Sequence, residues 1–143
     1  MSEEIKVTGS HGGSKYDGDK AQYSLLPPDS LKAVAEVMTE GAKKYSKNNW
    51  CGLELSRVLD AMLRHINAFQ SGEDYALDSH QHHLAHAMAN AMMAYHIALN
   101  FTEQDDRLFK YLEPKTKAYD LNFDNSYKKW TNQKIQSHID IDD

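Results

Sequence analysis

The chain of 143 residues has little of several residue types, and each shortage excludes a class of protein. Its single cysteine, Cys51, cannot form an intramolecular disulfide, which fits a reducing compartment and predicts a cytoplasmic protein. Neither a run of about 18 apolar residues nor an N-terminal apolar segment is present, so we expect no membrane span and no signal peptide. The net charge of −5 argues against a protein that coats nucleic acid.

Glycine and proline are confined to parts of the chain. All seven glycines lie at or before Gly72, and no proline lies between Pro28 and Pro114. Because both residues interrupt helices, the sequence predicts a loop-rich arm over residues 1–26, a helical domain over 27–112 and a polar tail over 113–143. Capping and apolar spacing predict a first helix that has Asp29 or Ser30 as its N-cap and runs to about Tyr45. A second helix is predicted over about 55–71 with Gly72 as its stop, a third over about 79–100 and, more weakly, a fourth over about 103–112. No strand pattern of useful length is present, so we expect an all-α fold.

Histidine and acidic residues gather near the predicted start of the third helix. Five of the eight histidines lie between positions 65 and 86, and an acidic loop precedes most of them. Imidazole and carboxylate groups can together hold a divalent metal or supply acid–base catalysis. Oxygen-rich sites favour magnesium or manganese, whereas added imidazoles favour manganese or zinc. The candidate ligands are Glu73, Asp74, Asp78, His83 and His86. The alternative is a hydrogen-bonded network of His83, His86 and Asn90 that fixes the register of the helix.

The first predicted helix carries Glu36 and Glu40 one turn apart, followed by Lys43 and Lys44. Two interpretations stay open for these charges. They form a solvated face with a Glu40–Lys44 ion pair, or the carboxylates face a metal and the lysines face phosphate. Glu36 and Glu40 are therefore secondary candidates for metal ligands.

Two further patterns have both a structural and a functional interpretation. Asp60 and Arg64 are one turn apart on the second predicted helix, where they form a simple ion pair unless Arg64 binds phosphate. Asn49 and Trp50 follow a lysine-rich helix end. An indole can stack on a nucleobase and an amide can read its edge, but a tryptophan in a turn is more often a hydrophobic anchor.

The order of several motifs along the chain is more specific than any one of them. The motifs are Lys15-Tyr16-Asp17-x-x-Lys20, Ser24-Leu25-Leu26-Pro27-Pro28, Gly41-Ala42-Lys43-Lys44-Tyr45-x-x-Asn48-Asn49-Trp50, Ser56-Arg57-x-x-Asp60-Ala61-x-Leu63-Arg64-His65, Ser71-Gly72-Glu73-Asp74 and His83-Leu84-Ala85-His86-Ala87-x-x-Asn90-Ala91. In this order, residues of about 14–100 resemble the phage-type dATP/dGTP diphosphohydrolase family, a branch of the MazG-like all-α nucleotide pyrophosphohydrolases.

The resemblance implies a MazG-like helical bundle that forms a homo-oligomer, as a dimer or tetramer. It implies magnesium- or manganese-dependent hydrolysis of dGTP, dATP or both to the monophosphate and pyrophosphate, in the host cytoplasm if a phage encodes the protein. The predicted catalytic residues are Glu73, Asp74 and Glu40. The predicted substrate-binding residues are Lys15, Lys20, Lys44, Tyr45, Asn49, Trp50, Arg64 and His65.

The chain also departs from the family pattern. His83-x-x-His86 stands where relatives carry an acidic pair, and Ala76 and His80 stand where relatives tend to carry an acid and a glycine. Two alternatives therefore stay open: a helical protein that binds nucleotide without turnover, and a helical protein stabilised by zinc. The third predicted helix is apolar on nearly every side, so we expect a partner subunit to cover part of it.

Overall fold

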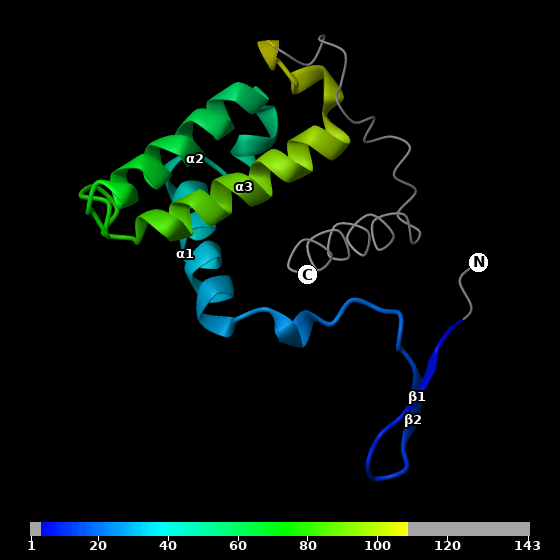
Figure 1. Cartoon of the computed structure of the whole chain (residues 1–143). Coiled ribbons are helices and arrows are strands. Elements are labelled where there is room, and N and C mark those ends of the chain that lie inside the picture. The colour runs from blue at the N-terminus through cyan, green and yellow to red at the C-terminus, as the bar shows by residue number, and fades with distance from the viewer. Residues whose placement is uncertain (1–3, 109–143) are drawn as a thin grey trace, which may run out of the picture. The chain divides into compact units, whose positions relative to one another are not determined.

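The computed structural model describes residues 4–108. The chain divides into residues 1–106 and 107–143, and the elements below belong to the first unit. Its three α-helices are α1 (Pro28–Lys44), α2 (Leu55–Gln70) and α3 (His83–Asn100). Helices α2 and α3 lie side by side and antiparallel, and α1 crosses them (Figure 1). Helix α3 contacts both others, so it is the centre of the packing.

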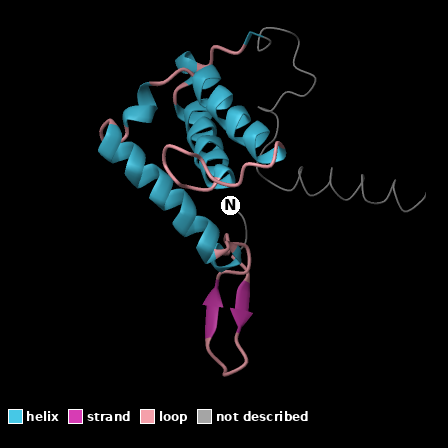
Figure 2. Ribbon diagram, turned by 90° about the vertical axis from the view of Figure 1, so that its left-hand side faces the viewer, coloured by secondary structure: helices cyan, strands magenta, loops and turns pink. Residues whose placement is uncertain are grey.

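The unit is mostly helical, as expected, but the prediction of an all-α fold was incomplete. A small antiparallel hairpin forms between β1 (Lys6–Thr8) and β2 (Ser14–Tyr16), and Figure 2 shows both strands. Gly12 turns the chain with a φ of +85°, which a residue with a side chain rarely adopts. Strands of three residues are too short to show a recognisable alternation of apolar and polar residues.

The N-cap predicted for the first helix was wrong by two or three residues. Helix α1 begins at Pro28 with Pro27 as its N-cap, and neither Asp29 nor Ser30 caps it. Proline suits the first helical position because its φ is already helical and its missing N–H has no partner there anyway. The carboxylate of Asp29 instead accepts a hydrogen bond from the adjacent N–H of Ser30, at 2.8 Å.

The second helix matches its prediction closely, and the third begins later than expected. Helix α2 ends at Gln70, and Gly72 follows with a φ of +99°, as its role as a stop requires. Residues 79–82 are not helical, because the loop before α3 is closed by its own hydrogen bonds. The N–H of Ala76 donates to the carbonyl of Gln81 at 2.9 Å. His82 is the N-cap of α3, and its Nδ1 accepts from the N–H of Leu84 at 3.0 Å.

The region predicted as a fourth helix begins differently. Residues Thr102–Gln104 form a short 3-10 turn in place of an α-helix, and residues after 108 lie outside the described part of the chain. The proposed tail, 113–143, therefore also lies outside it. In residues 4–108, no helix is long and apolar enough to cross a membrane.

The hydrophobic core lies between α2 and α3. Its buried members are Leu55 and Val58 from α2 and Ala94 and Ile97 from α3. Trp50 packs against this core from the 3-10 turn Asn49–Gly52, which follows α1. The core thus ties the turn after α1 to the α2–α3 pair, and this arrangement shapes the site described next.

Candidate functional site

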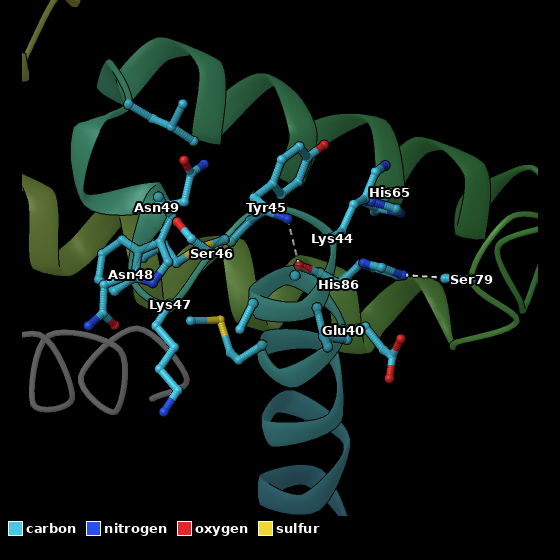
Figure 3. A pocket seen from close by; sticks show the side chains of 18 of the residues that line it. Glu40, Lys44, Tyr45, Ser46, Lys47, Asn48, Asn49, His65, Ser79 and His86 are labelled. Atoms are coloured by element: carbon cyan, nitrogen blue, oxygen red, sulfur yellow. Dashed lines mark hydrogen bonds between the residues drawn. The ribbon is translucent and has the colours of Figure 1, made fainter.

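A cavity of about 880 Å³ opens where the end of α1 and the turn after it face α2 and α3. This volume is in the range of small-molecule sites. The side chains that line it come from four separate parts of the sequence, and most appear in Figure 3. They are Val37, Met38, Glu40, Gly41, Ala42, Lys44, Tyr45, Ser46, Lys47, Asn48, Asn49, Trp50, Leu53, Arg64, His65, Asp78, Ser79, His86, Asn90 and Met93.

Many of the residues singled out from the sequence meet in this cavity. The predicted substrate-binding residues that line it are Lys44, Tyr45, Asn49, Trp50, Arg64 and His65. The predicted catalytic or metal-binding residues that line it are Glu40, Asp78 and His86. Lys15 lies in β2 and Lys20 in the turn after it, and neither lines the cavity. The individual roles stay predictions, but the packing of the chain brings most of the candidates together.

The cations at the cavity are not paired as the sequence suggested. Glu40 binds Lys43, with Oε1 at 2.9 Å from Nζ, so the alternative of a Glu40–Lys44 pair was wrong. Glu36 lies outside the cavity and forms an ion pair with Lys32, with Oε1 at 3.7 Å from Nζ. Lys44 Nζ instead lies 5.2 Å from the centre of the Tyr45 ring, on the cavity side.

Arg64 also differs from its structural interpretation. In the described part of the chain, Arg64 forms no ion pair with Asp60, and its exposed side chain lines the cavity. Lys44 and Arg64 therefore bring positive charge to the cavity from α1 and α2, and no carboxylate of residues 4–108 lies within salt-bridge distance of either. Such a pair of cations is suited to an anionic ligand.

Three histidines form a contiguous group, of which His65 and His86 line the cavity and His83 is buried behind them. The ring of His65 stacks on His86, with centroids 4.3 Å apart and ring planes within 3° of parallel. Nδ1 of His65 also lies 2.9 Å from Nδ1 of His83, so one of these two nitrogens donates a hydrogen bond to the other. His86 Nε2 in turn lies 2.8 Å from the hydroxyl of Ser79, a bond drawn in Figure 3. We refer to His65, His83 and His86 as the histidine triad.

Burial keeps His65 and His86 neutral at physiological pH. Burial lowers the pKa of His65 to about 4, with a further contribution from the positive charge that His86 and His83 would carry. Burial likewise lowers the pKa of His86, although the nearby Asp78 carboxylate opposes the shift. The pKa of Asp78 is also lowered, chiefly because its carboxylate accepts the backbone N–H of Ser79. The wall thus combines neutral imidazoles with one ionised carboxylate.

The acidic pair Glu73 and Asp74 lies behind the triad and does not line the cavity. Glu73 Oε2 is 3.5 Å from Nε2 of His83, whose ring is almost fully buried. The carbonyl of Asp74 accepts the N–H of His83 at 2.8 Å, so the backbone of Asp74 helps to fix the start of α3. The catalytic role of both residues stays a prediction.

The predicted metal ligands do not form a cage. Within residues 4–108, no three histidine, cysteine, aspartate or glutamate side chains are arranged so as to hold one ion. Nδ1 of His65 and Nδ1 of His83 are hydrogen-bonded to each other, and Nε2 of His86 is hydrogen-bonded to Ser79. A protein-made site with three ligands therefore does not fit the described residues, whereas one or two carboxylates that meet a magnesium ion on a bound phosphate would fit.

Other residues have roles that sequence reasoning missed or left open. The hydroxyl of Ser79 is hydrogen-bonded to Nε2 of His86, a contact that sequence reasoning missed. Asn48 adopts a φ of +60° and sends the turn back toward the core. Asn90 Nδ2 donates to the carbonyl of His86 at 2.8 Å, which is part of the network considered as the alternative. Trp50 is a hydrophobic anchor, because it packs on the core. Its ring also lies edge-on to the ring of His96, with centroids 5.4 Å apart.

Comparison with known proteins decides the family. The family model described as dATP/dGTP diphosphohydrolase, N-terminal, matches residues 10–107. The chain belongs to this family. The match confirms the family suggested by the motif order, and it extends past that order at both ends. It includes every residue that lines the cavity.

A curated relative carries the same description. The chain is 37% identical over 95 residues to a dATP/dGTP diphosphohydrolase of Salmonella phage PMBT28. The aligned region is 66% of this chain but only 33% of that protein, so the chain spans about a third of the length of this relative. No solved structure matches the chain.

Proposed function

We propose that this protein hydrolyses a purine deoxynucleoside triphosphate, dGTP or dATP, to the monophosphate and pyrophosphate. The observation that carries the proposal is the cavity in which Lys44 and Arg64, neither of which forms an ion pair within residues 4–108, meet Glu40, Asp78, His65 and His86. The family to which the chain belongs and the name of its phage relative support the same reaction.

Binding of the triphosphate is assigned to the cationic side chains. Lys44 comes from the end of α1 and Arg64 from the middle of α2, so they reach the cavity from two directions. Two cations that approach from different elements can contact successive phosphates, and charge-assisted hydrogen bonds to phosphate are about twice as strong as neutral ones. They also stabilise the charge that develops on the phosphate oxygens during hydrolysis.

Recognition of the base is assigned to the turn after α1. Asn48 and Asn49 offer amides that can both donate and accept, and the ring of Tyr45 is exposed beside them. Trp50 is committed to the core on one face, so in this proposal it shapes the floor of the cavity and its exposed edge meets the base.

The metal that the family implies fits best as part of the substrate. Magnesium commonly binds one or two protein carboxylates together with substrate phosphates, and it keeps several waters. Glu40 and Asp78 are the carboxylates that line the cavity. A magnesium or manganese ion on the triphosphate would meet them there and neutralise phosphate charge.

We also propose that the active form is a homo-oligomer. Large apolar side chains on α3 stay exposed in the single chain; they are Leu84, Met88, Met92, Tyr95 and Leu99. Their spacing of about four residues places them along one side of the helix. A contiguous exposed apolar stripe of this kind is typical of a protein–protein interface, and a second copy of α3 would cover it.

The test is incubation with each of the four deoxynucleoside triphosphates in magnesium or manganese, followed by separation of the products. We expect a purine monophosphate and pyrophosphate; inorganic phosphate and a diphosphate would contradict the reaction. A purine triphosphate that binds but is not consumed would favour the binding protein considered as an alternative. That alternative has one supporting observation, because position 76, where relatives tend to carry an acid, is here the buried Ala76.

Lys44→Met tests the phosphate contact. Loss of a charged hydrogen bond worth about 1.5–3 kcal/mol should raise KM by about tenfold or more. Lys32→Met is the matched control, since Lys32 is exposed on the same helix and pairs with Glu36 outside the cavity. Equal KM values for both variants would remove Lys44 from the binding site.

A further inference from the structure

The contact between Glu73 and the histidine triad has a consequence for the chemistry of the cavity. Nε2 of His83 is buried and has no hydrogen-bond partner among the described residues 4–108, although Glu73 Oε2 lies 3.5 Å away. A buried polar atom without a partner is rare and needs an explanation. The side chain of Glu73 is largely exposed, so a small rotation can close the gap.

The partner of His83 decides which of its nitrogens carries the proton. A neutral imidazole has one N–H and one bare nitrogen, and an ionised carboxylate only accepts. When His83 is neutral, Glu73 therefore favours its proton on Nε2, which leaves Nδ1 bare. Because Nδ1 of His83 lies 2.9 Å from Nδ1 of His65, the proton of that hydrogen bond must then belong to His65.

The same reasoning fixes the free nitrogen of His65. With its proton on Nδ1, His65 has a bare Nε2. No other residue in the described part of the chain is hydrogen-bonded to this Nε2, and His65 lines the cavity. The stacked ring of His86 holds the imidazole plane in place, so His65 presents a fixed acceptor.

We propose that Glu73, acting through His83, holds His65 as the Nδ1–H tautomer, so that its bare Nε2 accepts a hydrogen bond from the water that attacks the triphosphate. Glu73 and His83 are positioning residues in this scheme, and His65 is the residue that touches the water. The role of the water rests on the proposed hydrolysis. The tautomer itself does not, so the two can fail separately.

The opposite tautomer would give the cavity the opposite chemistry. If His83 carried its proton on Nδ1, its bare Nε2 would face the carboxylate of Glu73, which is repulsive. His65 would then have a bare Nδ1 and an N–H at Nε2, which can donate to phosphate but cannot accept from water. The charge at position 73 thus selects between an acceptor and a donor at the cavity wall.

The direct test is nitrogen-15 NMR of the histidine rings in the intact, substrate-free protein, which reports the tautomer of each. We expect His65 protonated on Nδ1 and His83 protonated on Nε2. Glu73→Lys replaces the acceptor with a donor at an exposed position, so it should invert both tautomers while the fold is kept. Glu103→Lys makes the same charge change at an exposed residue outside the cavity and should leave them as in the wild type.

Turnover gives the second readout. Glu73→Lys should lower kcat by about 10²-fold with little change in KM, because orientation of the reacting water acts on the chemical step. If Glu73 acted only through its charge, Glu73→Lys would instead lower KM with little change in kcat, since a new cation would favour an anionic substrate. Glu103→Lys should keep kcat within about twofold.

The outcomes separate the two proposals. An Nε2–H tautomer of His65 in the wild type, or unchanged tautomers in Glu73→Lys, overturns the inference even if the protein hydrolyses dGTP. If kcat is unchanged in a variant whose tautomers have inverted, His65 does not orient the attacking water. A wild type with the expected tautomers and no turnover contradicts the proposed function and leaves the Glu73–His83–His65 relay established.

Discussion

The half-buried histidines His65 and His86 should make folding stability depend on pH. His65 titrates at about 4 in the folded protein, against 6.5 for an unperturbed histidine, because burial and the neighbouring histidines disfavour its charge. The unfolded chain therefore binds a proton at a higher pH than the folded protein does. Stability is full above pH 6.5 and falls as the pH decreases toward about 4.

The magnitude follows from the difference between the two pKa values. A shift of this size for a fully buried group corresponds to about 3 kcal/mol. The ring of His65 is only half-buried, so solvent screening reduces the expected loss to about 1–2 kcal/mol. The lowered pKa of His86 adds to the loss of stability in the same direction. The lowered pKa of Asp78 affects stability only below about pH 3.8, the ordinary pKa of its carboxyl.

Urea unfolding, followed by circular dichroism, measures this loss between about pH 4.5 and pH 7. We expect the free energy of unfolding of the wild type to decrease as the pH is lowered from about 7 to about 4.5. The decrease should be smaller in His65→Gln, because glutamine does not titrate in this range. The control is His11→Gln, because His11 is exposed in the hairpin turn and should leave the slope unchanged. Identical slopes in His65→Gln and the wild type would refute the assignment of the loss to His65.

Three further predictions concern the fold and its assembly. Ile97→Ala removes a fully buried side chain from the core and should cost about 2–5 kcal/mol in urea unfolding; a cost below that range would mean the site collapses without a cavity. Gly72→Ala should cost about 1–2 kcal/mol, because a φ of +99° strains any residue with a Cβ; wild-type stability would show that the turn rearranges. Met92→Lys should lower the mass in sedimentation, since Met92 lies on the exposed apolar stripe of α3; an unchanged active oligomer would exclude that stripe from the interface.

Features that depend on neighbouring residues could be predicted from the sequence. Helix α2 and its stop at Gly72 were predicted within one residue, because apolar periodicity and a glycine with positive φ act locally. The family was also predicted correctly, since it depends on the order of motifs and not on their contacts. Errors occurred where local signals were weak: the short hairpin lacks a strand period, and the loop before α3 is closed by hydrogen bonds that no residue pattern announces.

The site itself depended on the packing of the chain. Residues 40–50, 64–65, 78–79 and 86–90 meet only because α1, α2 and α3 pack together, and contacts between distant residues leave no local pattern. Glu40 pairs with Lys43 and not with Lys44 because of side-chain geometry that helical spacing alone does not decide. The sequence showed that histidines and carboxylates were abundant near one turn. Only the tertiary structure decided that the histidines bond to one another, since partner choice requires positions in space and sequence spacing supplies only order.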